Sequence, residues 1–352
     1  MIQTPRARQR TVGKTSLSLP ALGFGAAPVG NLYRAVSDAE AGAALTAALA
    51  SGMNYFDTAP HYGFGLSEQR LGQCLPAEVV VSSKVGRRLE PLDADQRHAG
   101  ERDALRFGFA DTPDLTPVFD YSYDGVMRSF DESLARLGRP IDVLYAHDLG
   151  PLTHGAADAA RWREFCEGGY RALLELRASG AIKAFGLGVN EIAVCERALA
   201  ELDIDLLLLA GRYTLLEQEA GHRLLPQCLE QKVAVVVGGP YNSGILATGV
   251  KGAGPFYYNY EPASADIVAR VQQIETVCDR FGVPMNAAAL QFPLAHPSVV
   301  SVIAGFSSEA QVVAAVAWMN LPIVDAFWDE LKAQKLIATS APTPAADARS
   351  LM

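Results

Sequence analysis

Asp57-Thr58-Ala59-Pro60-His61-Tyr62-Gly63 follows the apolar residues 53–56 and leads through a glycine-containing turn into a helix predicted to begin near residue 67. An apolar run, a polar turn and a helix start in this order are typical of a buried strand that passes directly into a helix. The stretch also places a carboxylate and a phenol five residues apart at the end of that strand. Asp57 is as consistent with a turn cap as with chemistry, so the meaning of the pair depends on what the neighbouring strands bring to the same place.

The same order of strand and helix repeats along the chain, with no change of composition between its halves. Eight apolar runs are predicted as strands, at residues 16–25, 54–59, 78–84, 142–147, 184–189, 206–210, 233–238 and 299–305. Helical patterns follow them at residues 37–51, 67–75, 123–137, 159–179, 191–202, 217–231, 264–281 and 308–318, with one more at 324–335. Short buried strands that alternate with helices predict a parallel sheet, and eight repeats predict a closed (β/α)8 TIM barrel, here a single domain over residues 1–338.

A doubly wound open sheet with two lobes is the alternative architecture. Gly23 and Gly25 are its best support, but the next glycine, Gly30, comes too late for the dinucleotide-binding fingerprint. The pair Gly186 and Gly188 has no third glycine at all. We therefore interpret both glycine pairs as turns or tight packing.

Two segments depart from the repeat. Residues 86–119 are rich in Arg, Asp, Pro and Gly, and a loop of this length in a compact chain is usually functional or disordered. We interpret the segment as an inserted loop that forms a lid or pocket wall, with a plain surface excursion as the alternative. Residues 339–352 contain two prolines and many alanines and are predicted to form a flexible tail.

Composition limits the partners and the compartment. The 352 residues carry a formal net charge of −9 and no basic run longer than Arg87-Arg88, which excludes nucleic acid as a partner because phosphate binding needs clustered cations. The five cysteines are widely spaced and form no C-x-x-C pair, which indicates free thiols in a reducing compartment. The N-terminus has no apolar segment and every apolar run is too short to cross a bilayer, so we expect a cytoplasmic protein without membrane contact.

Four consecutive predicted strands end in polar side chains, namely Asp57, Lys84, His147 and Asn190. Barrel enzymes hold their reactive groups at the C-terminal ends of the strands, so these side chains should meet Tyr62 on one face. Each alone also has a structural explanation, as a turn cap, a solvated strand end or a core histidine. His147 and Asp148 together with His61 could indicate a metal site. This alternative is weak and no metal is predicted, because the other four histidines show no ligand spacing and no carboxylates cluster with them.

Together these groups can move a proton to or from an oxygen atom. A phenol titrates at about 10, and an ammonium such as that of Lys84 lowers this pKa, while a carboxylate behind the ammonium keeps it charged. An imidazole can hold the substrate oxygen beside the phenol. The set contains no obvious covalent nucleophile, so a redox reaction at an alcohol or a carbonyl requires a cofactor that carries the hydride.

Signals for a cofactor lie near the end of the chain. Ser308 and Gln311 have the spacing of a capping box, and a helix start after the eighth strand is the usual phosphate corner of a TIM barrel. Residues 239–244, after the seventh strand, form a glycine-containing loop whose backbone N–H groups can approach a pyrophosphate. Each signal is weak alone, because turns with Ser and Gly begin many ordinary helices.

These motifs together resemble the aldo-keto reductase superfamily over about residues 12–335. The matching segments are Asp57-Thr58-Ala59-x-x-Tyr62-Gly63 with Leu66-Ser67-Glu68, then Ser83-Lys84, Tyr145-x-His147 and residues 305–311. The resemblance implies a catalytic tetrad of Asp57, Tyr62, Lys84 and His147. It also implies that Asn190 binds the nicotinamide amide and that the diphosphate and adenosine are held by Tyr241, Asn242, Ser243, Gly244, Leu246, Gly305, Ser307 and Gln311.

Residues 86–119, 121–124 and 240–246 are similar to a bacterial branch of the superfamily that contains D-threo-aldose (L-fucose) 1-dehydrogenases and pyridoxal 4-dehydrogenases, with the plant L-galactose dehydrogenases as relatives. The branch implies oxidation of the anomeric hydroxyl of an aldose of the L-fucose, D-arabinose or L-galactose type to a lactone, or of pyridoxal to 4-pyridoxolactone, with Tyr62 as general acid or base. A general aldehyde or ketone reductase and a cofactor-binding sensor or regulatory subunit of the same fold are the alternatives. Substrate contacts are predicted for Tyr33, His61, Arg87 and Trp318, and further candidates for the pocket wall are Arg88, Phe107, Phe109 and Tyr241.

The choice between NAD and NADP depends on a cation. NADP-dependent members of the superfamily commonly carry Arg or Lys two residues after the position of Gly305, where this chain has Ser307. No Lys or Arg occurs between Arg280 and Lys332, so this segment offers no local cation for a 2′-phosphate. We therefore predict NAD as the cofactor and disfavour NADP, unless a basic residue reaches the corner from a distant loop.

Overall fold

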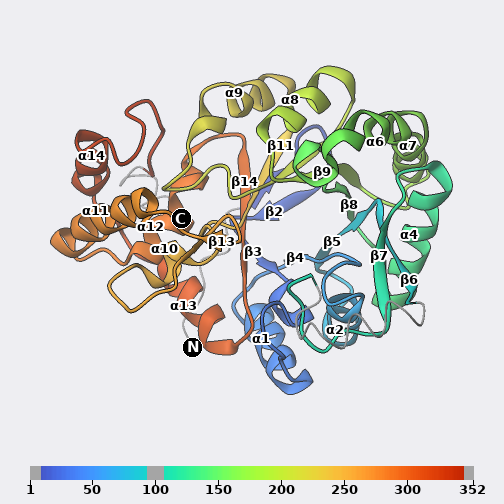
Figure 1. The fold of residues 1–352 in the computed structure, drawn as a ribbon, viewed down its shortest axis with the longest axis horizontal. Helices are drawn as coiled ribbons and strands as arrows, with labels where there is room; N and C mark the ends of the chain where they lie inside the picture. The colour runs from blue at the N-terminus through green and yellow to red at the C-terminus, as the bar shows by residue number, and fades with distance from the viewer. Residues whose placement is uncertain (1–8, 93–106, 345–352) are drawn as a thin grey trace.

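Eight parallel strands form a closed barrel that helices surround (Figure 1). The computed structural model describes residues 9–92 and 107–344, and the barrel order is β10-β11-β14-β3-β4-β5-β8-β9. β3 (Leu22–Gly25) pairs with β14 (Val299–Gly305) and so joins the first and last barrel strands of the chain. The predicted (β/α)8 barrel is confirmed, and the open sheet is excluded.

The barrel strands form where successive residues are apolar, so that both faces of each strand are apolar. Nearly all their residues are buried, because helices cover the outer face and side chains fill the interior. The other barrel strands are β4 (Tyr55–Asp57), β5 (Val80–Val85), β8 (Val143–His147), β9 (Ala184–Val189), β10 (Leu206–Ala210) and β11 (Ala234–Gly238). The surrounding helices are α1 (Asp38–Ala50), α2 (Leu66–Cys74), α4 (Tyr123–Leu137), α6 (Asp158–Glu164), α7 (Tyr170–Ala178), α8 (Ile192–Glu201), α9 (Leu224–Gln231) and α13 (Glu309–Asn320).

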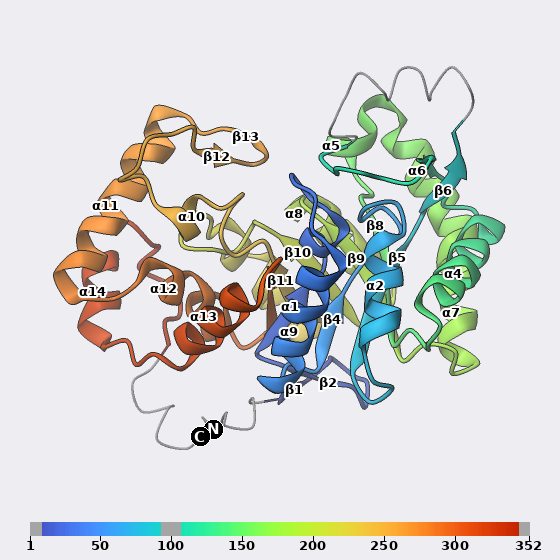
Figure 2. The same ribbon diagram turned by 90° about the horizontal axis from the view of Figure 1, so that it is seen from below.

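An antiparallel hairpin lies at the N-terminal ends of the barrel strands (Figure 2). It consists of β1 (Gln9–Thr11), which lies in the lead that was not predicted as a strand, and β2 (Ser18–Pro20). Val12, Leu17 and Leu19 of this hairpin are buried in one cluster with residues of the barrel strands. Burial of each such side chain contributes about 1.5–3 kcal/mol, so the hairpin closes this end firmly and leaves the C-terminal ends of the strands for a site.

Two further hairpins stand at the opposite end (Figure 2). β6 (Arg87–Pro91) pairs with β7 (Leu115–Phe119), and β12 (Tyr257–Tyr258) pairs with β13 (Glu261–Pro262). The prediction of residues 86–119 as a loop is therefore corrected at both of its ends, because these ends pair with each other. Residues 93–106 of that segment lie outside the described residues.

The helices depart from the prediction at a few places. The helix predicted over residues 159–179 contains a π-helical turn, Phe165–Gly169, where an added Cβ on Gly169 would lie 2.6 Å from the Tyr121 carbonyl oxygen. Close approach of two backbones therefore explains the glycine. The structure also describes α5 (Pro151–His154), α10 (Ile245–Thr248), α11 (Ala265–Phe281), α12 (Met285–Gln291), which was missed, and α14 (Asp325–Ala333), which packs beside α11.

The C-terminal part of the chain packs on this framework. Of residues 339–352, the structure describes 339–344, among which Ala341 is buried.

No single helix within residues 9–92 and 107–344 has the length and apolar character needed to span a membrane. Only α13 and α14 taken together, which meet at a 92° bend, meet that test by length and composition.

Candidate active site

Asp57 and Lys84 form a buried ion pair at the ends of the neighbouring strands β4 and β5. The Lys84 Nζ donates to Asp57 Oδ2 at 2.7 Å and to the Thr58 carbonyl oxygen at 2.9 Å. The Ser82 hydroxyl donates to the other carboxylate oxygen, Oδ1, at 2.7 Å. Burial alone would lower the pKa of Lys84, but Asp57 and Tyr62 together outweigh it and raise that pKa above its ordinary value. Lys84 is therefore a charged ammonium in a fixed position.

Tyr62 lies against this ammonium, in the turn that follows β4. The Lys84 Nζ lies 4.5 Å from the centroid of the Tyr62 ring. Burial raises the pKa of Tyr62 to about 12, although Lys84 acts in the opposite direction. Lys84 therefore lowers this pKa as expected, but the loss of solvation is larger than the attraction of one ammonium, so the net pKa lies above the ordinary value. The phenol is protonated at neutral pH.

His147 ends β8 and meets the edge of Tyr62. The two ring centroids are 6.0 Å apart and the ring planes are inclined at 84°. Burial, together with the charges of Lys84 and Arg87, lowers the pKa of His147 well below its ordinary value, so the imidazole is neutral. Its Nδ1 is buried and has no hydrogen-bond partner in the described part of the chain. A neutral imidazole beside a phenol can orient a substrate oxygen without competing for the proton.

A cavity of about 540 Å³ opens on these side chains. Tyr62, Lys84 and His147 line it, and Asn190 joins them from the residue that follows β9. Asp57 lies behind Lys84, which it contacts. The cavity volume falls in the range of about 300–1,000 Å³ that small-molecule sites occupy. The four strand ends selected from the sequence therefore converge on one cavity.

The four residues predicted to contact substrate separate into two groups. Tyr33, His61 and Arg87 line the cavity. Trp318 is a correction: it is not among the lining residues that the structure describes, because it lies on α13 and packs against the hydrophobic core. Its carbonyl oxygen accepts a hydrogen bond from the Gln291 side chain at 2.7 Å, which ties this part of α13 to α12.

Arg87, on the cavity wall, contacts an acidic and an aromatic side chain. Its Nη1 donates to Asp148 Oδ2 at 2.6 Å, and its guanidinium lies 5.2 Å from the centroid of the Phe119 ring. The same Asp148 oxygen lies 3.6 Å from His147 Nε2. Burial, with the charge of Arg87, lowers the pKa of His61 to about 2, so this imidazole is also neutral. Asp148 was missed as a site residue, although its position directly after His147 could have indicated it.

Aromatic and polar residues from distant segments complete the wall. Phe107 and Phe109 line the cavity, which supports the interpretation of this part of residues 86–119 as a pocket wall. Arg88 instead forms ion pairs with Glu90, Asp120 and Glu132. Tyr260 and Glu191 also line the cavity, and no sequence motif indicated either of them.

The predicted diphosphate loop after β11 is held by its own hydrogen bonds. The N–H groups of Asn242, Gly244 and Leu246 donate to carbonyl oxygens within residues 239–241, and the Leu246 side chain is fully buried. The Asn242 side chain is also engaged, since its Oδ1 accepts from Thr214 at 2.6 Å and its Nδ2 donates to Gly211. These three N–H groups are therefore engaged within the loop, and Leu246 is positioned as a core residue. Ser243 accepts a hydrogen bond from the backbone N–H of Tyr260 at 2.9 Å.

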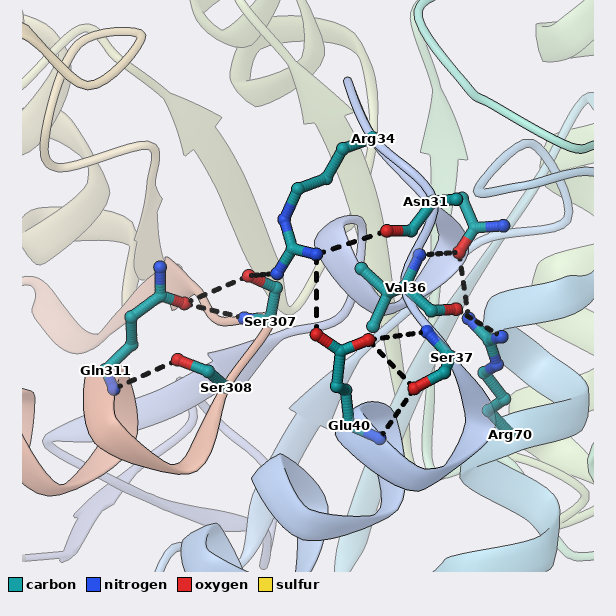
Figure 3. Close-up of polar contacts among 10 residues, drawn as sticks. Asn31, Arg34, Val36, Ser37, Glu40, Arg70, Ser307, Ser308 and Gln311 are labelled. Atoms are coloured by element: carbon teal, nitrogen blue, oxygen red, sulfur yellow. Dashed lines mark hydrogen bonds and ion pairs between the residues drawn. The ribbon is translucent and has the colours of Figure 1, made fainter.

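The predicted corner after β14 holds Gly305, Ser307 and Gln311 together. The Ser308 hydroxyl accepts from the Gln311 N–H at 3.4 Å, which is one half of the expected capping box. The Gln311 side chain, however, accepts from the Ser307 N–H at 2.8 Å. The corner also has the cation that residues 281–331 lack, because Arg34 Nη2 donates to the Ser307 hydroxyl at 3.2 Å (Figure 3). The prediction that this corner has no cation is therefore wrong, because an arginine from the loop after β3 reaches it.

Comparisons with known proteins agree with this geometry. The model of the aldo/keto reductase family matches residues 21–335. The chain is 45% identical to the pyridoxal 4-dehydrogenase of Microbacterium luteolum over 94% of this chain and 98% of the relative. It is 42% identical to a D-threo-aldose 1-dehydrogenase of a Pseudomonas species, over 92% and 96% of the two chains. Among solved structures, the holo form of an aldo-keto reductase from Bacillus halodurans superposes with a TM-score of 0.71, at 26% identity and over 95% and 98% of the two chains.

Proposed function

The chain belongs to the aldo/keto reductase family, and from this premise we propose that it oxidises the anomeric hydroxyl of an aldose, or pyridoxal as its hemiacetal, to a lactone with NAD. The family makes the protein an oxidoreductase that works with a nicotinamide cofactor. The finer assignment is supported by two dehydrogenases of this type, at 45% and 42% identity over nearly the whole chain.

The observation that carries the proposed chemistry is the buried ammonium of Lys84 between Asp57 and the Tyr62 ring, at the wall of the cavity. In the oxidative direction the Tyr62 phenolate takes the hydroxyl proton while the carbon–hydrogen bond on the same carbon breaks and the carbonyl forms. Lys84 stabilises the phenolate, and Asp57 holds Lys84 in place. His147 orients the substrate oxygen. A bound nicotinamide supplies the acceptor for the hydride.

The residues present fit such a cofactor. The Tyr241 hydroxyl is buried, and within residues 9–92 and 107–344 it has no hydrogen-bond partner. A Cβ added to Gly244 would meet nothing within 4 Å, so the backbone borders open space there. We propose that Asn190 binds the nicotinamide amide and that Tyr241, Asn242, Ser243 and Gly244 flank the diphosphate. Gly305, Ser307 and Gln311 are the proposed contacts of the adenosine, and Leu246 contributes by supporting the loop from the core.

The composition of the cavity wall supports the substrate class. One part of the wall is polar, with the Arg87–Asp148 pair and Asn190, and another part is aromatic, with Tyr33 and Phe109. Hydroxyl groups of a sugar ring can bind the polar part while the ring face packs on the aromatic part. A hydroxylated aromatic aldehyde such as pyridoxal can use the same two surfaces.

The test is an oxidation assay with L-fucose, D-arabinose, L-galactose and pyridoxal, each with NAD and with NADP, in which the absorbance of the reduced nicotinamide is followed. Mass spectrometry of the product should show a lactone, and kcat/KM should be higher with NAD. Oxidation that is absent while aldehydes are reduced rapidly would favour a general reductase instead. NAD binding without turnover in either direction would favour a sensor or regulatory subunit.

A further inference from the structure

Arg34 comes to the proposed adenosine corner from the opposite end of the chain. β3 and β14 are neighbours in the barrel, so the loop after β3 lies beside the turn after β14. Arg34 Nη2 donates to the Ser307 hydroxyl at 3.2 Å, while Nη1 donates to the Ala35 carbonyl oxygen at 3.1 Å (Figure 3). The Arg34 guanidinium thus lies beside a segment, between Arg280 and Lys332, that contains no Lys or Arg of its own.

Glu40 faces the same guanidinium. Its Oε1 lies 3.6 Å from Arg34 Nη1, and the two side chains are 50% and 51% exposed, so a ligand can reach both. Glu40 is fixed by the capping box of α1, in which its Oε2 accepts from the Ser37 N–H at 2.9 Å and from the Ser37 hydroxyl at 2.8 Å. These hydrogen bonds lower the pKa of Glu40, so the carboxylate is charged at neutral pH.

The loop that carries Arg34 is held by buried groups. The Asn31 Oδ1 accepts from the Val36 N–H at 3.0 Å and from Arg70 Nη1 at 3.0 Å. Arg70 Nη2 donates to the Val36 carbonyl oxygen at 2.8 Å and to Asp38 at 2.7 Å. The two ends of residues 31–36 are therefore tied together, and Arg34 projects from a closed loop toward Ser307 (Figure 3).

We propose that the Arg34–Glu40 pair sets the choice between NAD and NADP, because Glu40 neutralises the Arg34 charge that a 2′-phosphate would need. This inference rests on the proposed function. A dianionic phosphate at Ser307 would gain a bidentate contact from Arg34 only if the guanidinium left Glu40, and the Glu40 carboxylate would repel it. The 2′-hydroxyl of NAD is neutral and meets no such repulsion. The pair therefore favours NAD even though a cation is present.

The test is a calorimetric titration of the whole protein with NAD and with NADP, in the wild type, Glu40→Gln, Arg34→Gln and the double variant. Glutamine at position 40 removes the charge but can still serve the capping box, so α1 should keep its start. Glu40→Gln should lower the Kd for NADP by about tenfold, because Arg34 is then free to make a charge-assisted hydrogen bond to the 2′-phosphate. The Kd for NAD should change by less than about twofold. In the Arg34→Gln background the same substitution should change the ratio of the two constants by less than about threefold, because only the repulsion by an exposed carboxylate is then relieved and no guanidinium is released.

The exposed pair Arg280–Glu330, which joins α11 to α14 at 2.8 Å, provides the matched control. Glu330→Gln also removes one negative charge and releases one arginine, and it should leave the NADP-to-NAD ratio unchanged. An unchanged ratio in Glu40→Gln, or an equal change without Arg34, would overturn the inference while NAD binding still supported the proposed function. Failure of the wild type to bind either nucleotide would overturn the proposed function and the inference with it.

Discussion

Replacement of Lys84 by Met tests the ion pair at the centre of the site. The Lys84 and Asp57 side chains are 2% and 3% exposed, and their charged atoms are 2.7 Å apart. Met fills nearly the same volume but leaves the Asp57 carboxylate buried without its counter-charge. Removal of one partner of a buried pair costs about 3–5 kcal/mol of the free energy of unfolding. Because the Ser82 hydroxyl still donates to Asp57 at 2.7 Å, we expect a value of about 3 kcal/mol, at the lower end of this range.

The double variant Asp57→Asn/Lys84→Met separates stability from chemistry. Both charges are then absent, and the remaining groups are neutral, so stability should return to within about 1.5 kcal/mol of the wild type. Turnover should stay low in the single and the double variant alike, because the Tyr62 phenolate has lost the ammonium that stabilises it.

The assay combines urea unfolding, followed by circular dichroism, with steady-state oxidation of the best substrate over a range of pH. In Lys84→Met the pH–rate profile should shift to higher pH, since the pKa of Tyr62 rises when Lys84 no longer opposes the effect of burial. A single variant as stable as the wild type would refute the account of the buried pair. A double variant that is no more stable than the single one would refute it equally.

Three further predictions concern the same face. Tyr62→Phe should lower kcat by about 10²–10⁴-fold and leave the Kd for NAD nearly unchanged; wild-type turnover would disprove the proton transfer. In the wild type, kcat/KM for oxidation should rise with pH toward the Tyr62 pKa of about 12, because the phenolate fraction rises; a flat profile would contradict this. Since the pKa of His61 is lowered to about 2, this residue should lower the free energy of unfolding by up to about 1.4 kcal/mol per pH unit as pH drops below about 6.5, in addition to the contribution of His147, whose pKa is also lowered. The free energy of unfolding of His61→Asn should depend less steeply on pH, and an equal slope would mean that the dependence comes from other groups.

The fold could be predicted because its signals are local. Ser37 and Glu40 form the capping box that begins α1 at Asp38, and β9 occupies residues 184–189 as its apolar run indicates. α12 was missed because it follows Pro284 without a side-chain cap and its seven residues are nearly all buried, so no amphipathic period marks it. The pairing of β6 with β7 joins Arg87 to Phe119, and no local pattern reports a partner so far along the chain.

The site shows the same division. The proximity of Asp57, Tyr62, Lys84 and His147 was predictable because a barrel brings the C-terminal ends of its strands to one face, whatever their separation in sequence. Arg34 and Ser307 are 273 residues apart, and their contact depends on which loops the closed barrel makes neighbours. Trp318 was misplaced because a helix position alone does not say which face the side chain takes. The direction in which Lys84 changes the pKa of Tyr62 was predictable, but the net pKa was not, because the sequence does not show the extent of burial.

Residues 31–36 connect the two halves of the proposed site. On the substrate side, the Tyr33 N–H donates to the Gly108 carbonyl oxygen at 2.7 Å, and Asn31 accepts from the backbone N–H of residue 110 at 3.0 Å, next to the aromatic wall of the cavity. On the other side, Arg34 reaches Ser307 at 3.2 Å. The loop is closed on itself by the buried Asn31 side chain, so a shift at one end must be taken up at the other or break those bonds. A part of the cavity wall and the arginine at the proposed adenosine corner thus belong to one closed loop, and substitutions in either half have to preserve its geometry.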